Sequence, residues 1–144
     1  MSEDKPKTIH ILLVEDDEVD QMAIKRAFRK KKISNPVYIA KDGIEALAIL
    51  RGEGGYQQLP RPFMVLLDLN MPRMNGIEFL NVIRKDKELR RSIVFVLTTS
   101  KAEKDRIMAY DYNVAGYILK SDVGNGFMNA IEMLDYYWRV VKFP

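Results

Sequence analysis

Acidic side chains directly follow two of the most apolar segments of the chain. Glu15 and Asp16 come after the segment 9–14, and Asp68 comes after the segment 63–67. If these segments are adjacent strands of one parallel sheet, Asp16 and Asp68 meet at the carboxyl ends of the strands. Two carboxylates about 4 Å apart repel each other by about 4 kcal/mol at an effective dielectric constant near 20, so the group needs a cation. Because all the ligands are oxygen, the expected ion is a hard divalent one, Mg²⁺.

Hydroxyl and ammonium groups follow two further apolar segments. A run of three hydroxyl residues begins at Thr98, after the segment 93–97, and Lys120 follows the segment 116–119. Beside a carboxylate and a metal ion, these groups complete a cradle for a phosphoryl group. The metal and the lysine would neutralise phosphate oxygens, the hydroxyl would donate to another, and a carboxylate would be the nucleophile.

Five apolar segments alternate with five amphipathic ones along the chain. The predicted strands are residues 9–14, 36–40, 63–67, 93–97 and 116–119, and the predicted helices are 18–31, 43–51, 76–85, 102–112 and 123–141. This alternation is typical of an α/β fold, a doubly wound five-stranded parallel sheet with helices on both faces. The second and fifth strands are short and mixed in composition, as edge strands often are. Asp17 is expected to cap the first helix.

The length of 144 residues fits one domain. Residues 1–8 are polar and charged, which predicts a flexible arm, and residues 9–144 form the domain with its extended last helix. The arm does not resemble a secretory signal, and no apolar segment is long enough to cross a bilayer. We therefore expect a cytoplasmic protein without membrane contact.

The net charge of +3 is mild. Two groups of basic residues are expected to be solvated helix ends, so no nucleic-acid partner is predicted. These groups are Lys25, Arg26, Arg29, Lys30, Lys31 and Lys32, and Arg84, Lys85, Lys87, Arg90 and Arg91.

Four motifs make the chain resemble the receiver domains of bacterial response regulators. They are LLVEDDEVD, LLDLNMPRMNG, VLTTS and GYILK, in the order and spacing of that family, and the resemblance covers essentially the whole chain. It is most similar to the small stand-alone regulators that serve bacterial phytochromes. The resemblance implies a flavodoxin-like sheet with strand order 2-1-3-4-5. It also implies a two-component phosphoprotein that accepts a phosphoryl group from a sensor histidine kinase, needs Mg²⁺, and signals by protein contact. Its only catalysis would be its own phosphotransfer and dephosphorylation.

The resemblance assigns the metal site residue by residue. Asp68 matches the phosphoacceptor, and Asp16 matches the direct Mg²⁺ ligand. Glu15 matches the acidic residue that holds the ion through water. Asn70 would offer its backbone carbonyl to the ion.

The resemblance also assigns the residues that respond to phosphorylation. Lys120 matches the lysine that pairs with the phosphoryl group, Thr98 the switch hydroxyl, and Tyr117 the aromatic residue that turns inward with it. One departure concerns the residue after the lysine, because Ser121 stands where the family usually has a proline in a cis peptide bond. A cis bond before another residue costs about 2.5–4 kcal/mol, so the turn at Lys120 is expected to differ.

The last helix carries a wide apolar band. One stripe should cover the sheet, and a second stripe beside it, together with Tyr136 and Phe143, predicts a homodimer or partner interface. Purely intramolecular packing of the tail is the alternative. The first stripe is Phe127, Ile131, Leu134, Trp138 and Val141, and the second is Ala130, Met133, Tyr137 and Val140.

Two other functions remain open from the sequence. An aspartyl-nucleophile phosphohydrolase would need a second carboxylate two residues after Asp68, but that position is Asn70, which is a poor general acid. A receiver-like docking module without phosphorylation is supported only by Ser121. A nucleotide-binding fold is disfavoured because no glycine-rich loop follows the first strand.

Overall fold

A five-stranded parallel sheet forms the centre of the molecule, with strand order β2-β1-β3-β4-β5. The computed structural model describes residues 8–98, 112–119, 125–140 and 143. The strands are β1 (His10–Val14), β2 (Val37–Ala40), β3 (Phe63–Asp68), β4 (Ile93–Thr98) and β5 (Gly116–Leu119). The helices of the described residues are α1 (Glu18–Lys30), α2 (Gly43–Arg51), α3 (Gly76–Lys85) and α5 (Asn125–Val140). The predicted doubly wound sheet and its strand order are confirmed, with β2 and β5 at the edges.

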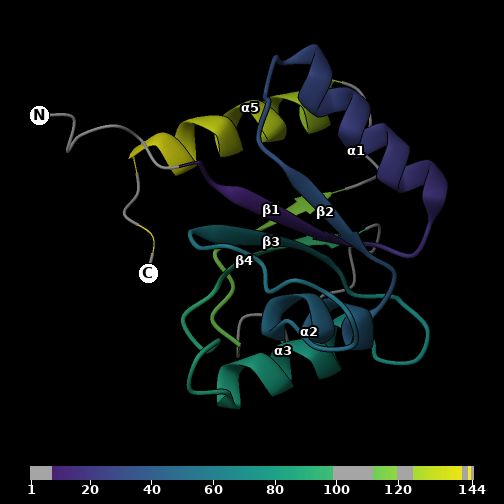
Figure 1. The fold of residues 1–144 in the computed structure, drawn as a ribbon. Helices are drawn as coiled ribbons and strands as arrows, with labels where there is room; N and C mark the ends of the chain where they lie inside the picture. Colours follow the sequence, from purple (N-terminus) through teal and green to yellow (C-terminus); the bar gives the residue numbers. More distant parts are fainter. Residues whose placement is uncertain (1–7, 99–111, 120–124, 141–142, 144) are drawn as a thin grey trace, which may run out of the picture.

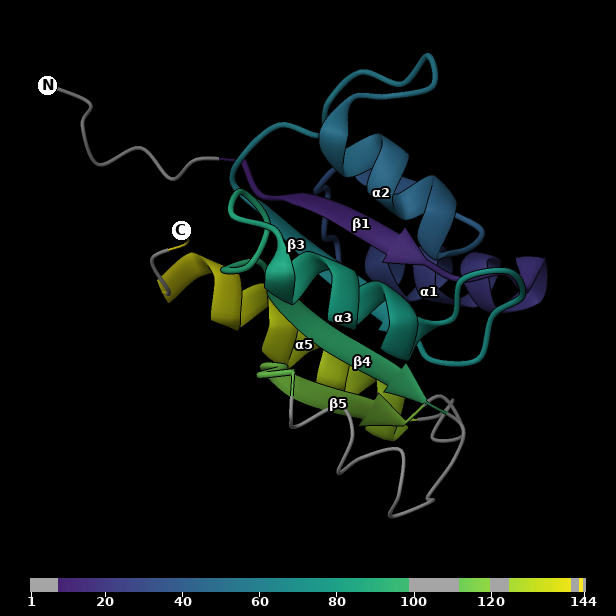
Figure 2. The same ribbon diagram turned by 90° about the horizontal axis from the view of Figure 1, so that it is seen from below.

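Helices cover both faces of the sheet, as Figures 1 and 2 show. On one face, α2 and α3 bury a core that includes Leu12, Val65 and Phe79. On the other face, α1 and α5 bury a second core that includes Ile11 and Met64. Neighbouring residues of one strand therefore enter opposite cores, which is why the central strands are apolar without interruption.

The central strand β3 is buried over its whole length, including Asp68 at its end. Asp68 still belongs to the strand and pairs in register with Leu97 of β4, so the strand is one residue longer than the sequence predicts. This pairing fixes the backbone of Asp68 within the sheet.

Side-chain caps determine where the helices begin. Asp17 accepts hydrogen bonds from two N–H groups in the first turn of α1, so its predicted capping role is confirmed. Asn75 and Glu78 form a capping box at α3. Asp42 caps α2 by accepting a hydrogen bond from the N–H of Glu45. All three caps lie at the end of the sheet where the strands end, so they fix the loops around Asp68.

Arg84 differs from the expectation of a solvated helix end. Its side chain is half-buried, and its guanidinium donates to the carbonyl oxygens of Tyr112 at 2.6 Å and Asn113 at 3.2 Å. It also donates to the carbonyl oxygens of Arg90 at 2.9 Å and Ser92 at 2.8 Å. Burial lowers the pKa of Arg84. The reason is tertiary: the side chain of Arg84 joins the end of α3 to the loop before β4 and to the turn before β5.

The last helix, α5, packs on the sheet and leaves part of its band in water. Leu134 is fully buried, as predicted. Tyr137 lies edge-on to Phe95 with a centroid distance of 5.2 Å and to Phe143 at 6.2 Å. Both Tyr137 and Phe143 pack against the α1/α5 core, which agrees with the intramolecular alternative for these two residues. Met133, Tyr136 and Val140 are exposed.

Several predictions fall outside the described residues. They concern the N-terminal arm up to residue 7, the helix 102–112 except for Tyr112, and the side chains of Phe127, Ala130, Ile131, Trp138 and Val141. The division into an arm and a domain therefore stays a prediction. Among the described helices, none has the length and apolar character that crossing a membrane would require.

Candidate functional site

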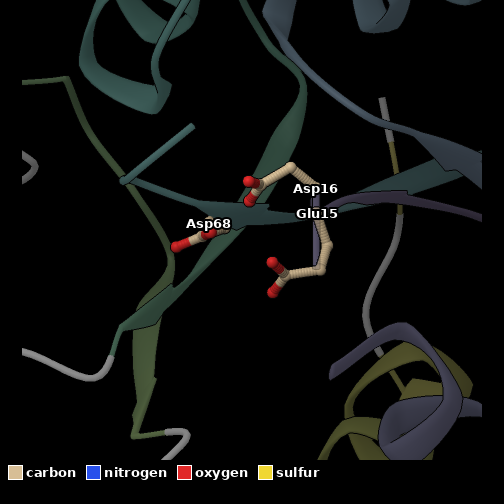
Figure 3. A group of neighbouring side chains, drawn as sticks. All are labelled: Glu15, Asp16 and Asp68. Carbon is tan, nitrogen blue, oxygen red and sulfur yellow. The ribbon is translucent and has the colours of Figure 1, made fainter. Parts of the chain in front are cut away.

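Three carboxylates meet where β1 and β3 end (Figure 3). One oxygen each from Glu15, Asp16 and Asp68 lies within 4.8 Å of the others. Glu15 and Asp16 directly follow β1, and Asp68 is the last residue of the neighbouring β3. Glu15 is fully buried and Asp68 nearly so, whereas Asp16 is exposed. The sheet thus brings together the three acidic residues that the sequence predicts at one site.

Hydrogen bonds fix the position of Glu15. Its N–H donates to the carbonyl oxygen of Ala40, at the end of β2, at 2.9 Å. The side-chain amide of Gln21 in α1 donates to its carbonyl oxygen at 2.7 Å. The N–H of Asp17 reaches a carboxylate oxygen of Glu15 at 3.2 Å. Glu15 is therefore held by β2 on one side and α1 on the other.

Hydrogen bonds also hold the loop after β3 in position around Asp68. The N–H of Asn70 donates to an Asp68 carboxylate oxygen at 3.2 Å, and the N–H of Gly76 donates to the carbonyl oxygen of Leu69 at 3.1 Å. A Cβ at Gly76 would lie 2.6 Å from the carbonyl oxygen of Asp68, so only glycine fits there. The close approach explains why a glycine begins α3.

The charge of this group fits a divalent cation. Three carboxylates share one rim, two of them buried, and burial makes an uncompensated negative charge costly. Carboxylate oxygens at these separations can converge on one ion, and they are ligands that Mg²⁺, Mn²⁺ and Ca²⁺ accept. The donor set and its separations therefore suit a hard metal ion.

The other predicted site residues come from β4 and β5. Thr98 is the last residue of β4, and Leu97 before it pairs with Asp68. Tyr117 in β5 is half-buried and packs against the α2/α3 core. Lys120 lies outside the described residues. The roles of Thr98, Tyr117 and Lys120 therefore stay predictions, as do the individual metal-binding roles.

Two residues near the site were not predicted from the sequence. Asp42 follows β2 and is buried, and Arg73 lies in the loop after β3. They form an ion pair, in which Nη2 of Arg73 lies 2.6 Å from Oδ2 of Asp42. The pattern of Asp42 and Glu45 at the start of a helix could have indicated the cap. Nothing in the sequence pairs Asp42 with Arg73, because they are 31 positions apart.

Comparison with known proteins gives a consistent family. The family model for the response regulator receiver domain matches residues 11–132 of the chain. Response regulator Rcp1 of Synechocystis sp. (strain ATCC 27184 / PCC 6803 / Kazusa) is 35% identical over 138 residues, which cover 96% of this chain and 94% of Rcp1.

Solved structures give the same result. The Mn²⁺-bound form of response regulator Rcp1 superposes with a TM-score of 0.82 at 35% identity, covering 94% of this chain and 99% of that one. The phosphorylated cyanobacterial phytochrome response regulator RcpA superposes with a TM-score of 0.84 at 35% identity, covering 96% of this chain and 99% of that one. The chain thus has relatives of nearly the same length that share its fold.

Proposed function

The chain belongs to the response regulator receiver family of two-component signalling proteins, and we propose that Asp68 is the residue that accepts the phosphoryl group. The observation that carries this proposal is the position of Asp68. Its carboxylate ends the central strand, is nearly buried, and lies beside two further carboxylates at the edge of the sheet. A nucleophile needs such a fixed position opposite groups that can neutralise a phosphoryl group.

The reaction that we propose is a transfer from a phosphohistidine. A carboxylate oxygen of Asp68 attacks phosphorus, the P–N bond breaks, and the departing imidazole nitrogen keeps the electron pair and is protonated. The product is an acyl phosphate on Asp68. Its hydrolysis by water returns the carboxylate and releases inorganic phosphate. Apart from this transfer and the hydrolysis of the acyl phosphate, we propose no turnover of a substrate, since receivers are in general signalling proteins.

Members of this family bind a divalent metal in their acidic pocket, and Mg²⁺ is the ion that we propose here. Asp16 and Asp68 would bind it directly, Glu15 through water, and Asn70 through its backbone carbonyl. The ion supplies positive charge that offsets the phosphate oxygens. The oxygen atoms of Glu15, Asp16 and Asp68 within 4.8 Å of one another support this assignment, and one matched relative is a Mn²⁺-bound form.

Thr98 and Lys120 complete the proposed phosphoryl site. Thr98 would donate its hydroxyl to a phosphate oxygen, and Lys120 would pair with the phosphoryl charge. Movement of Thr98 toward the phosphoryl group would let Tyr117 turn inward. The position of Thr98 at the end of β4, one residue after the partner of Asp68, supports its part.

A sensor histidine kinase is the partner that the family implies, and we propose a phytochrome-type kinase in the cytoplasm. The likeness to Rcp1 and to the phytochrome response regulator RcpA supports this choice. The experiment is phosphotransfer from an autophosphorylated bacterial phytochrome kinase, followed by loss of label from the kinase. Transfer to the wild-type chain but not to Asp68→Asn is expected. Label that remains on the kinase while other kinases transfer efficiently would reject the phytochrome partner.

We also propose that the exposed part of α5 forms a homodimer interface. Met133, Tyr136 and Val140 are 47%, 72% and 70% exposed, and their spacing places them on one side of the helix. Since Tyr137 and Phe143 pack on the core, this surface is narrower than the sequence indicates. Replacing Met133 and Tyr136 together by alanine should lower the sedimentation coefficient. An unchanged value, with and without phosphorylation, would reject the interface.

A further inference from the structure

Asp42 and Arg73 connect two loops that border the acidic rim. Asp42 lies between β2 and α2, and Arg73 lies between β3 and α3. Both Nε and Nη2 of Arg73 approach Oδ2 of Asp42, at 2.8 Å and 2.6 Å. The other oxygen, Oδ1, accepts a hydrogen bond from the N–H of Glu45 at 2.9 Å. Both oxygens of this buried carboxylate therefore accept hydrogen bonds.

The charge state of Asp42 agrees with that geometry. Burial acts to raise the pKa of Asp42, but the hydrogen bonds from Glu45 and Arg73, together with the charge of Arg73, outweigh it and lower the pKa. Arg73 itself is largely exposed. The pair thus joins the buried carboxylate of Asp42 to the exposed guanidinium of Arg73, which comes from the loop after β3.

The strand order shows what the pair spans. β1 lies between β2 and β3, so a contact between the loops after β2 and β3 joins the loops on either side of the end of β1. That end carries Glu15 and Asp16 (Figure 3). The loops are also joined by a backbone hydrogen bond from Gly43 to Met74, at 2.9 Å.

Arg73 is held in a backbone conformation that most residues avoid. Its φ is 60°, in the left-handed region that favours glycine. Such conformations persist where surrounding contacts determine them. Arg73 lies three residues after Asn70, and one such contact is its ion pair with Asp42.

We propose that the Asp42–Arg73 pair positions the loop 69–75, and through it the backbone carbonyl of Asn70 and the carboxylate of Asp68, for the metal ion. Asp42 and Arg73 are positioning residues and touch neither the ion nor the phosphoryl group. This inference rests on the proposed function of Asp68. Loss of the pair removes no ligand residue, but it lets the loop relax and move the ligands from their positions. The affinity for the metal ion therefore falls, by more than a general loss of folding stability would cause.

The chain offers a matched control for this test. Asp86 accepts a hydrogen bond from the N–H of Glu88 at 2.8 Å with one oxygen and from Arg51 at 3.0 Å with the other. This is the bonding pattern of Asp42, but Asp86 caps the far end of α3, away from Asp68. Asp42→Asn and Asp86→Asn therefore each remove one Asp–Arg ion pair, at opposite ends of the α2/α3 layer. Asparagine retains a carbonyl oxygen that can still cap α2.

The experiment is calorimetric titration of each protein with Mg²⁺, together with amide hydrogen exchange over residues 69–76. Asp42→Asn should raise the Kd for Mg²⁺ by about 3- to 10-fold, below the 10–100-fold typical of residues that contact a ligand directly. It should also speed exchange in the loop, whereas Asp86→Asn changes neither. Arg73→Asn, which tolerates the positive φ, should reproduce the effect, and saturating Mg²⁺ should restore phosphorylation in both variants.

Wild-type affinity in Asp42→Asn and Arg73→Asn, or an equal loss in Asp86→Asn, would overturn the inference while leaving the proposed function intact. A wild-type protein that binds no Mg²⁺ would overturn the proposed function itself, and the inference with it.

Discussion

Glu15, which directly follows β1, and Asp68, the last residue of the adjacent β3, each place one carboxylate oxygen within 4.8 Å of the other, although both side chains are buried. β1 and β3 run parallel and in register up to Val14 and Leu67, so the residues that follow reach the same rim. Repulsion between two carboxylates at this separation opposes folding, and a cation at the rim would relieve it.

Removing one of these charges should stabilise the metal-free protein. Two unit charges at this separation repel by roughly 3 kcal/mol at an effective dielectric constant near 20, and solvent at Asp16 screens part of this. Asp68→Asn is therefore expected to raise the free energy of unfolding by about 1 kcal/mol in chelator. Urea unfolding of both proteins measures the difference. An Asp68→Asn protein less stable than wild type would show that repulsion is not the dominant effect at this rim.

Added Mg²⁺ should stabilise the wild-type fold and not a variant that lacks a ligand. An ion that binds only the folded state contributes about 2.7 kcal/mol at a concentration of 100 Kd. Asp16 is exposed, so Asp16→Asn should preserve the metal-free fold yet lose most of the Mg²⁺-dependent rise in Tm. Thermal unfolding with and without Mg²⁺ measures both quantities. Equal rises in the two proteins would exclude Asp16 as a ligand.

The sequence predicts most of the fold because its signals are local. The central strands are continuously apolar, the helices have regular apolar spacing, and Asp17 is a strong cap. The convergence of Glu15, Asp16 and Asp68 could also be predicted, since carboxyl ends of parallel strands share one edge.

What the sequence does not predict depends on contacts between distant residues. Arg84 lies in a run of basic residues typical of a solvated helix end, yet carbonyl groups of the turn at Tyr112 and Asn113 surround it. Tyr137 has the spacing of the outer stripe of the last helix, but its ring packs edge-on against Phe95 of the core. The partners of Asp42 and Arg73 likewise come from separate loops. In each case, tertiary packing chooses between two locally acceptable positions.

Loss of Arg84 should destabilise the domain strongly. Its guanidinium satisfies carbonyl oxygens from two loops, and hydrogen bonds of charged groups contribute about 1.5–3 kcal/mol each when removal leaves partners unsatisfied. Because these bonds are not additive, Arg84→Ala should cost about 2–4 kcal/mol of unfolding free energy. Its exposed neighbour serves as control, and Lys85→Ala should stay within about 0.5 kcal/mol of wild type. Similar urea midpoints for the two variants would contradict a structural role for Arg84.

The contribution of Asp42 to stability should depend on pH. Its pKa is lowered from the ordinary value of 3.8, so the folded state binds the proton less readily than the unfolded state. The stabilisation is therefore present above 3.8 and is lost as the pH falls below it through the folded pKa. Wild type should exceed Asp42→Asn in stability near about pH 6, and the gap should shrink toward about pH 3. A gap that widens on acidification would have the wrong sign for this ion pair.

The most direct test of the central claim is the intact mass of the protein after incubation with a small-molecule phosphodonor and Mg²⁺. We expect one added phosphoryl group, carried on Asp68, that is absent from Asp68→Asn and from wild type in chelator. A folded wild-type protein that binds Mg²⁺ but gains no mass, or an Asp68→Asn protein that gains the same mass, would contradict the assignment of Asp68 as the phosphoacceptor.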